Sequence, residues 1–222
     1  NSLFKLGRLE GISRPTIGSI LPTIKGVTFV LDVGASVDCK PKHLLEYAVM
    51  GSSYMNTVLN ISNPKVGLLG IGEGKSKGNE LTAQTYELLE KSKINFIGNI
   101  EGGDILRGKA DVVVCDGFTG NIVLKLSESF VEILRYKMKE YSEKGFFKKL
   151  WIGSFVGTFK KILKDFDYQT LGGVPLLGVN GVSFVGHGRS TPLAVKNMIF
   201  KSEIAARKNL PERIKENLKK FI

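Results

Sequence analysis

The chain has 222 residues, of which 42% are apolar and 24% charged, and its mean hydropathy is +0.02. A chain of this size buries enough apolar surface to form one folded domain, so this composition excludes a disordered protein, a coiled coil and a disulfide-stabilised scaffold. No apolar run reaches the roughly 18 residues that a membrane span needs, and Cys39 and Cys115 form no CxxC pair, so we expect a cytoplasmic protein.

The net charge of +11 is distributed unevenly along the chain. Residues 1–136 contain 15 basic and 14 acidic side chains, whereas residues 137–222 contain 17 basic and 7 acidic ones. A uniformly basic nucleic-acid binder does not show this pattern, so we expect no nucleic-acid partner. A local basic face favours an acidic protein or an anionic membrane surface as partner, although solvated lysines on helix surfaces explain much of the excess.

Short apolar segments alternate with amphipathic ones along the chain. We predict strands at residues 25–32, 66–71, 94–97, 110–116 and 182–185, and helices at residues 41–60, 81–91 and 120–141 and from Pro192 onward. Strands without polar alternation, separated by helices, are typical of a parallel sheet that is covered on both faces. The sequence therefore predicts a single three-layer, doubly wound, mostly parallel α/β domain over residues 1–222.

Ligands in such folds bind at the carboxyl ends of the strands, which directs attention to the loops that follow them. The glycine-rich loop at residues 70–79 imitates a nucleotide-binding motif but matches none, because a Walker A loop needs glycine where Leu69 stands and a dinucleotide fingerprint needs a small residue where Lys75 stands. Its backbone N–H groups, with Lys75 or Lys77, can still hold a phosphate. A surface turn with solvated lysines is an equally good interpretation.

Two further loops carry carboxylates at the ends of predicted strands. Residues 116–121 join a buried strand to a long helix, and their two glycines allow a ligand to approach a helix N-terminus that favours anions. Asp116 either takes part in chemistry, which we favour, or caps the helix. In the loop at residues 32–39, Asp32 either orients a catalytic group or caps a turn.

A late motif, Gly186-His187-Gly188, lies between a short strand and a helix. Histidine in a glycine-flanked loop suits proton transfer near neutral pH, although a solvated imidazole in a turn is the alternative. The only other histidine, His43, is far away in the sequence, so we expect no metal site.

Residues 145–166 interleave aromatic side chains with lysines, and residues 137–164 hold 8 basic and 2 acidic side chains. On a helix the apolar positions share one stripe, which is typical of a helix that binds an anionic membrane surface. A helix in a dimer interface or a core has the same pattern, so both interpretations stay open. The predicted membrane or partner contacts are Phe147, Trp151, Phe155 and Phe159.

Six motifs in order resemble the PlsX family of bacterial phosphate acyltransferases, and the likeness runs from about Phe4 to Phe200. They are residues 31–35 (Leu-Asp-Val-Gly-Ala), 38–44 (Asp-Cys-Lys-Pro-Lys-His-Leu), 77–80 (Lys-Gly-Asn-Glu), 95–102 (Asn-Phe-Ile-Gly-Asn-Ile-Glu-Gly), 110–121 (Ala-Asp-Val-Val-Val-Cys-Asp-Gly-Phe-Thr-Gly-Asn) and 186–188 (Gly-His-Gly). Ser36 and Gly70 stand where the family has Asn. The family also carries an N-terminal region that ends in a Ser/Thr/Gly-rich loop, and we expect this chain to begin just after it.

The resemblance implies a fold like that of isopropylmalate dehydrogenase and phosphotransacetylase, and a reaction in which inorganic phosphate attacks acyl-ACP to give acyl phosphate for glycerophospholipid synthesis. It implies no cofactor and no metal. The implied partners are acyl carrier protein, a second copy of the chain in a homodimer, and an anionic membrane surface or a membrane-bound glycerol-3-phosphate acyltransferase, so that the protein is cytoplasmic or peripheral on the inner face of the membrane.

Combined with the loop analysis, the resemblance gives a set of candidate site residues. The predicted catalytic residues are His187 as general acid or phosphate donor, Asp116 as the group that orients it, and Asn121 or a backbone N–H of Gly117 or Gly120 as the group that polarises the acyl carbonyl. The predicted substrate or phosphate ligands are Asp32, Lys77, Gly78, Asn79, Gly117, Thr119, Gly120, Lys125 and Gly188.

Two other functions remain open from the sequence. A CoA-dependent phosphate acetyl- or butyryltransferase is compatible with the same fold. A non-catalytic, membrane-associated scaffold is compatible with the basic amphipathic segment. A nucleotide-dependent dehydrogenase is disfavoured, because the dinucleotide fingerprint is missing.

Overall fold

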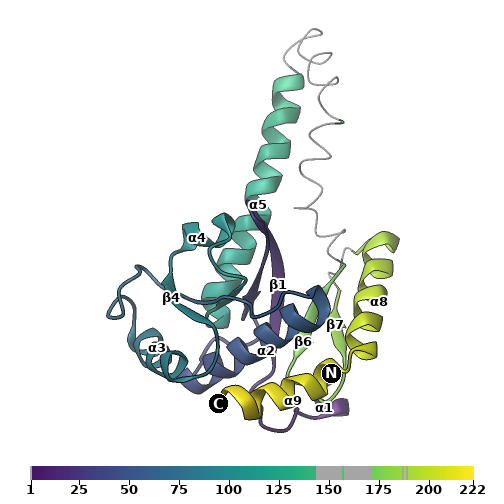
Figure 1. Cartoon of the computed structure of the whole chain (residues 1–222). Coiled ribbons are helices and arrows are strands. Elements are labelled where there is room, and N and C mark those ends of the chain that lie inside the picture. The colour runs from purple at the N-terminus through teal and green to yellow at the C-terminus, as the bar shows by residue number, and fades with distance from the viewer. Residues whose placement is uncertain (1, 144–156, 158–171, 187, 189) are drawn as a thin grey trace.

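The computed structural model describes residues 2–143, 157, 172–186, 188 and 190–222 (Figure 1). Over these residues seven strands form one sheet in the order β4-β3-β5-β2-β1-β6-β7. The strands are β1 (Thr16–Thr23), β2 (Gly26–Leu31), β3 (Val66–Leu69), β4 (Phe96–Ile100), β5 (Val112–Val114), β6 (Val174–Leu177) and β7 (Ser183–Val185).

The strand directions divide the sheet into two parts. Strands β4, β3, β5 and β2 are mutually parallel, whereas β1 is antiparallel to β2, β6 to β1 and β7 to β6. Five strands therefore point one way, and β1 and β7 point the other way. The prediction of a mostly parallel sheet is confirmed, with the difference that three of the six strand pairs are antiparallel.

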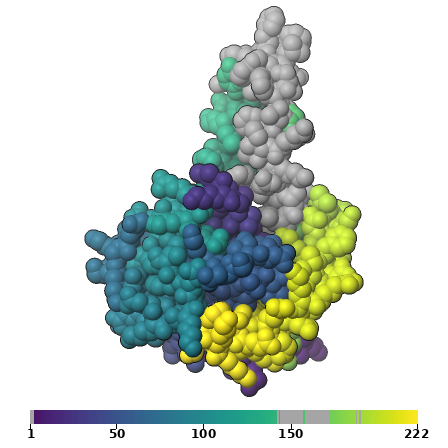
Figure 2. Space-filling view, in the orientation of Figure 1, coloured from purple at the N-terminus to yellow at the C-terminus, as the bar shows by residue number. Residues whose placement is uncertain are grey.

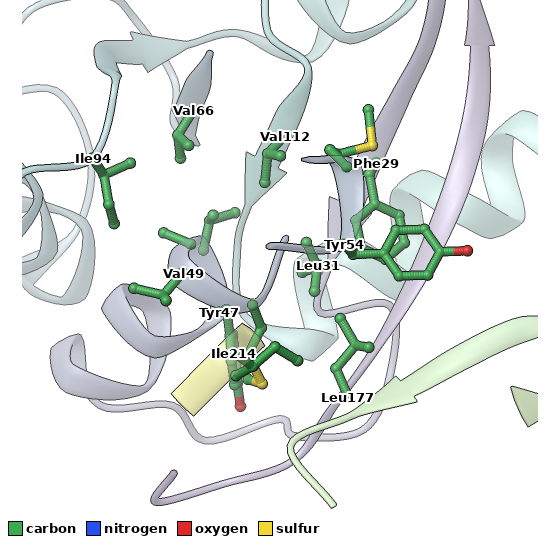
Figure 3. Packing of buried hydrophobic residues seen from close by; sticks show 14 of the residues in the cluster. Phe29, Leu31, Tyr47, Val49, Tyr54, Val66, Ile94, Val112, Leu177 and Ile214 are labelled. Atoms are coloured by element: carbon green, nitrogen blue, oxygen red, sulfur yellow. The ribbon is translucent and has the colours of Figure 1, made fainter. Parts of the chain in front are cut away.

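Helices cover both faces of this sheet, which confirms the three-layer architecture. Neighbouring strand residues point to opposite faces, so Phe29 and Leu31 of β2 belong to one core cluster and Val30 to another. The first cluster, shown in Figure 3, contains side chains of α2 (Pro41–Leu59), α3 (Glu80–Lys91), α8 (Pro192–Arg207) and α9 (Leu210–Phe221). The second contains side chains of α4 (Gly102–Arg107) and α5 (Gly117–Ser142).

Helix α2 is the central element of the first face. Proline stands in its first turn, and Asn60 ends it in the left-handed conformation with φ of 59°. A Cβ atom on Gly51 would lie 2.6 Å from both Leu31 and Val112, so this glycine allows α2 to lie directly on β2 and β5. Tyr54, one turn further, stacks on Phe29 with 4.5 Å between ring centroids. Helix α9 lies beside α2 along the base of the molecule, as Figure 2 shows.

Helix α5 starts at the sheet and extends beyond it (Figure 1). Its 26 residues span about 39 Å at 1.5 Å per residue. The predicted amphipathic segment at residues 145–166, with Phe147, Trp151, Phe155 and Phe159, lies outside the described residues except for Gly157. None of the described helices is long and apolar enough to cross a membrane.

Five elements of the described chain were not predicted: α1 (Ser2–Leu6), β1, α4, β6 and α9. Each predicted strand and helix within the described residues is present, and the largest shift at a helix start is that of α5, which begins at Gly117 rather than at Gly120.

Candidate active site

Three of the loops singled out above start side by side at one edge of the sheet. Strands β3, β5 and β2 are neighbours and parallel, so their carboxyl ends lie at the same edge. The segments that follow them are residues 70–79, 115–116 and 32–39 respectively, and residues 117–121 of the predicted loop form the first turn of α5. This is the edge at which ligands bind in open α/β folds.

Asp32 is the buried acidic group at this edge, with an exposed fraction of 0%. Its Oδ1 accepts hydrogen bonds from the backbone N–H groups of Gly34 (3.0 Å) and Ala35 (2.7 Å). Its Oδ2 is buried and has no hydrogen-bond partner among the described residues. Burial raises the pKa of this carboxyl above the ordinary value, although the hydrogen bonds from the loop backbone act in the opposite direction. One oxygen of this carboxyl holds the loop backbone by hydrogen bonds, and the other has no hydrogen-bond partner among the described residues. Such a carboxyl is a candidate functional group.

The N-terminus of α5 packs directly on the Asp32 loop. A Cβ atom on Gly120 would lie 1.8 Å from the carbonyl oxygen of Asp32, and one on Gly117 would lie 2.6 Å from that of Ser36. The N–H of Gly117 also donates to the Ser36 carbonyl at 2.8 Å. Two glycines predicted to admit a ligand therefore admit the neighbouring loop instead.

Asp116 caps α5 in this structure. Its Oδ1 accepts from the N–H of Thr119 at 2.9 Å, and its Oδ2 accepts from the hydroxyl of Thr119 at 2.7 Å. The N–H of Gly120 donates to the Asp116 carbonyl at 2.9 Å. The expectation that a backbone N–H of Gly117 or Gly120 faces the acyl carbonyl is therefore wrong for this structure, because both N–H groups have acceptors within the chain.

Asn121 and Lys125 follow on successive turns of α5. The Oδ1 of Asn121 would lie 3.5 Å from a Cβ atom on Gly34, so its exposed side chain lies against the Asp32 loop. Lys125 forms an ion pair with Glu128 at 2.9 Å on the exposed surface of the helix.

The loop at residues 70–79 closes on β4 rather than on β5. The side-chain amide of Asn99 donates to the carbonyl of Gly74 at 2.9 Å, and Asn79 caps α3 by accepting from the N–H of Thr82 at 2.9 Å. Gly78 has φ of 137°, a conformation that favours glycine. Lys77 is exposed, whereas Lys75 pairs with Glu90 at 2.6 Å. This loop thus lies at the same edge and is held to β4 and α3.

The histidine motif is reached from a strand that runs the other way. We expected the loops before Asn121 and around His187 to end parallel strands and so to meet at one edge. This expectation is wrong, because β7 is antiparallel to β2 and β5. The carboxyl end of β7, at Val185, therefore lies toward the edge of the sheet opposite to Asp32. His187 itself lies outside the described residues, and Gly188 is exposed.

Sequence reasoning missed one polar side chain beside this edge. Ser36 is 2% exposed, and its hydroxyl has no hydrogen-bond partner among the described residues. Its place in the loop after Asp32 was a signal for it. The two cysteines nearby are poor nucleophiles, because burial raises the pKa of both the Cys39 and the Cys115 thiol. Among the described residues, no three His, Cys, Asp or Glu side chains gather as a metal site would require.

Comparison with known proteins identifies the family. Residues 1–213 match the model of a family described as "Fatty acid synthesis protein". The chain belongs to this family. The resemblance to PlsX-type phosphate acyltransferases is thereby confirmed.

Similar members of the family share about half of their residues with this chain. The phosphate acyltransferase of Desulforudis audaxviator is 50% identical over 209 residues, which cover 94% of this chain and 62% of that protein. That of Pelotomaculum thermopropionicum is 47% identical over 221 residues, covering 100% of this chain and 64% of the relative. The chain thus spans less than two thirds of the length of these relatives. Among solved structures, the EutD phosphotransacetylase from Staphylococcus aureus matches 59% of this chain and 46% of its own, with 18% identity and a TM-score of 0.47.

Proposed function

We propose that this chain takes part in transferring an acyl group from acyl-ACP to inorganic phosphate, giving acyl phosphate and free ACP. The observation that carries the proposal is the junction of the Asp32 loop with the start of α5. It combines a buried carboxyl that has an unpaired oxygen, the exposed side chain of Asn121 and the positive end of the α5 helix dipole. The relatives named phosphate acyltransferase support the reaction class.

In the reaction, a phosphate oxygen attacks the thioester carbonyl carbon, the carbon–sulfur bond breaks, and the departing thiolate takes up a proton. The protein must therefore bind the phosphate, stabilise the carbonyl oxygen and supply the proton. The negative charge that develops on the carbonyl oxygen needs a hydrogen-bond donor. Because the N–H groups of Gly117 and Gly120 already have acceptors, we assign this role to the side-chain amide of Asn121.

Asp32 supports the phosphate site through its loop. Its completely buried carboxyl accepts from the N–H groups of Gly34 and Ala35 and so fixes the backbone that lies against Asn121. Lys77 and the backbone of Gly78, at the same edge, provide positive charge and N–H groups for the anion. Asp116 then acts through α5, because its carboxylate holds the helix start in place.

His187 is the proposed proton donor to the thiolate. It lies in the only glycine-framed histidine motif of the sequence, and histidine suits proton transfer near neutral pH. The thioester sulfur is bonded to the carbonyl carbon that Asn121 polarises. Because β7 runs away from the Asp32 edge, this role therefore requires the imidazole of His187 to come within hydrogen-bond distance of a sulfur held beside Asn121.

The charge distribution supports an acidic protein partner. Residues 137–222 carry an excess of ten basic side chains, and ACP is acidic. The same excess, with the amphipathic sequence at residues 145–166, supports peripheral binding to an anionic membrane.

An exposed apolar stripe on α5 supports a homodimer. Its members are 50–70% exposed and recur every three or four residues. Such a face in a two-fold interface meets its own copy. The stripe consists of Phe118, Ile122, Leu126, Phe130 and Ile133.

The test is to mix the protein with palmitoyl-ACP and labelled phosphate and to measure acyl phosphate that reacts with hydroxylamine. Formation of this product supports the proposal. Product from acetyl- or butyryl-CoA alone would instead assign a CoA-dependent transferase. If neither donor gives product and phosphate does not protect the protein against thermal unfolding, the scaffold alternative is supported.

A further inference from the structure

We propose that the cavity between α5 and the β1–β6 part of the sheet binds the hydrocarbon chain of the acyl substrate. Nothing in the family comparison assigns this cavity. The inference rests on the proposed function for its choice of an acyl chain, but not for the existence of the apolar site.

The cavity has a volume of about 240 Å³ and lies between elements that are distant in the sequence. Leu124 and Val131 of α5 form one side, and Leu21 of β1 with Val174 and Pro175 of β6 form the floor. Val185 and Ala194 close the side toward α8. These side chains are aliphatic, so this part of the cavity suits an apolar ligand.

Both walls of the cavity lead back to the candidate site. On α5, Leu124 and Lys125 are one turn beyond Asn121, which corresponds to about 6 Å along the helix axis. On β1, the carbonyl of Ile17 accepts from the N–H of Val33 at 3.0 Å, and Ser19 begins the cavity two residues later. A carbonyl group held at Asn121 is therefore positioned to direct its chain into the cavity.

The polar groups of the cavity suit a ligand with one polar end. Lys125, Ser127 and Glu128 of α5, together with Ser190 before α8 and Lys201 within it, also line the cavity. Burial lowers the pKa of Lys201, as expected of an amine held against apolar surroundings. An acyl thioester or acyl phosphate combines an apolar chain with a polar end, which matches this lining better than a wholly apolar or wholly ionic molecule does.

The alternative occupant is an apolar side chain of a second copy. The exposed stripe on α5 argues against it, because Leu126 is 70% exposed and lies about 200° around the helix from Leu124. The surface proposed for the second copy and the cavity therefore occupy opposite sides of the same helix.

The experiment measures binding of cis-parinaric acid, a fluorescent 18-carbon fatty acid, in the absence of phosphate and ACP. We expect saturable binding by the parent protein and at least tenfold weaker binding by Leu124→Trp, whose ring fills the cavity. The matched control is Leu106→Trp on α4, where the leucine is 43% exposed, and it should bind as the parent does. Ser127→Leu, at a half-buried position on the same wall, is a milder second variant in case Leu124→Trp is unstable.

Two results overturn the inference: a parent that shows no saturable binding, and cavity variants with parental melting temperatures that bind as tightly as Leu106→Trp. Neither result bears on whether acyl phosphate is formed from palmitoyl-ACP. Conversely, a protein that forms no acyl phosphate but binds the fatty acid in a Leu124-dependent way refutes the proposed function and retains the apolar site.

Discussion

The contact between Gly120 and the Asp32 loop gives a sharp test of the site's geometry. An alanine Cβ at position 120 would lie 1.8 Å from the Asp32 carbonyl oxygen and 3.0 Å from the Cys115 sulfur. Since real Cβ contacts are essentially never below 3.0 Å, α5 or the loop must move by at least about 1.2 Å, the difference between 3.0 and 1.8 Å. We therefore expect Gly120→Ala to destabilise the protein although alanine is the better helix former.

The expected size follows from two opposing terms. Alanine in place of glycine within a helix stabilises by about 0.5–1 kcal/mol, and overpacking against a fixed neighbour costs about 1–3 kcal/mol. The midpoints of the two terms differ by about 1.3 kcal/mol, which lowers the melting temperature by about 3–5 °C in a chain of this length. The control is Gly103→Ala on α4, where the nearest atom to the new Cβ is the end of Arg107 at 3.7 Å. Calorimetry should show Gly120→Ala below the parent and Gly103→Ala at or above it; equal melting temperatures for the two variants would refute the packing argument.

Four further predictions concern the site and the surfaces. Burial raises the pKa of Asp32, so the folded state binds the proton more tightly than the unfolded state does. The parent protein should therefore lose stability as the pH rises from the ordinary Asp pKa through the raised one. Urea unfolding between about pH 4 and 8 should show that the Asp32→Asn variant lacks this loss. His187→Ala should lower turnover at least tenfold without changing the melting temperature, since general acid catalysis contributes about 10²–10⁴-fold. Leu126→Glu should shift the protein toward the monomer in sedimentation experiments, whereas an unchanged dimer would remove the α5 stripe as the interface. Phe155→Glu should reduce co-sedimentation with anionic vesicles, as should added salt, and parental binding by this variant would exclude the membrane interpretation.

The parallel half of the sheet was predictable because its strands carry their own signal. Val112–Val114 and Val66–Leu69 are apolar without alternation, and both are fully buried. Strand β1 lacks such a signal, since it contains Gly18, Ser19 and Pro22. Its burial depends on a tertiary contact: a Cβ atom on Gly18 would lie 2.3 Å from the ring of Phe29, so the glycine makes room for an aromatic side chain of the neighbouring strand.

Helix α9 did carry a local signal that was not used. Leu210, Ile214 and Leu218 recur every four residues in an otherwise charged segment, and all three are buried.

For the site, the sequence located the carboxylates but not their hydrogen bonds. Asp32 and Asp116 were found because each follows a buried strand. Asp32 has one carboxyl oxygen without a hydrogen bond among the described residues, whereas both carboxyl oxygens of Asp116 accept hydrogen bonds from Thr119. This difference depends on loop conformations, which the composition of the loops does not encode. The direction of β7 likewise follows from its antiparallel pairing with β6. The order of the strands along the chain does not determine this direction.

The Asp32 loop contact, the cavity and the exposed apolar stripe involve different positions of helix α5, so experiments can test them separately. Gly117 and Gly120 hold its start against the Asp32 loop, Leu124 and Val131 continue along the sheet side and line the cavity, and Leu126 faces away. At 3.6 residues per turn, positions 120, 124, 127 and 131 share one side, and positions 122, 126, 130 and 133 share the opposite one. A helix that only covers a sheet needs apolar residues on one side. Apolar residues on both sides of α5 are expected if the second side packs against a second copy of the chain. Substitutions two residues apart, at Leu124 and Leu126, should therefore change chain binding and association independently.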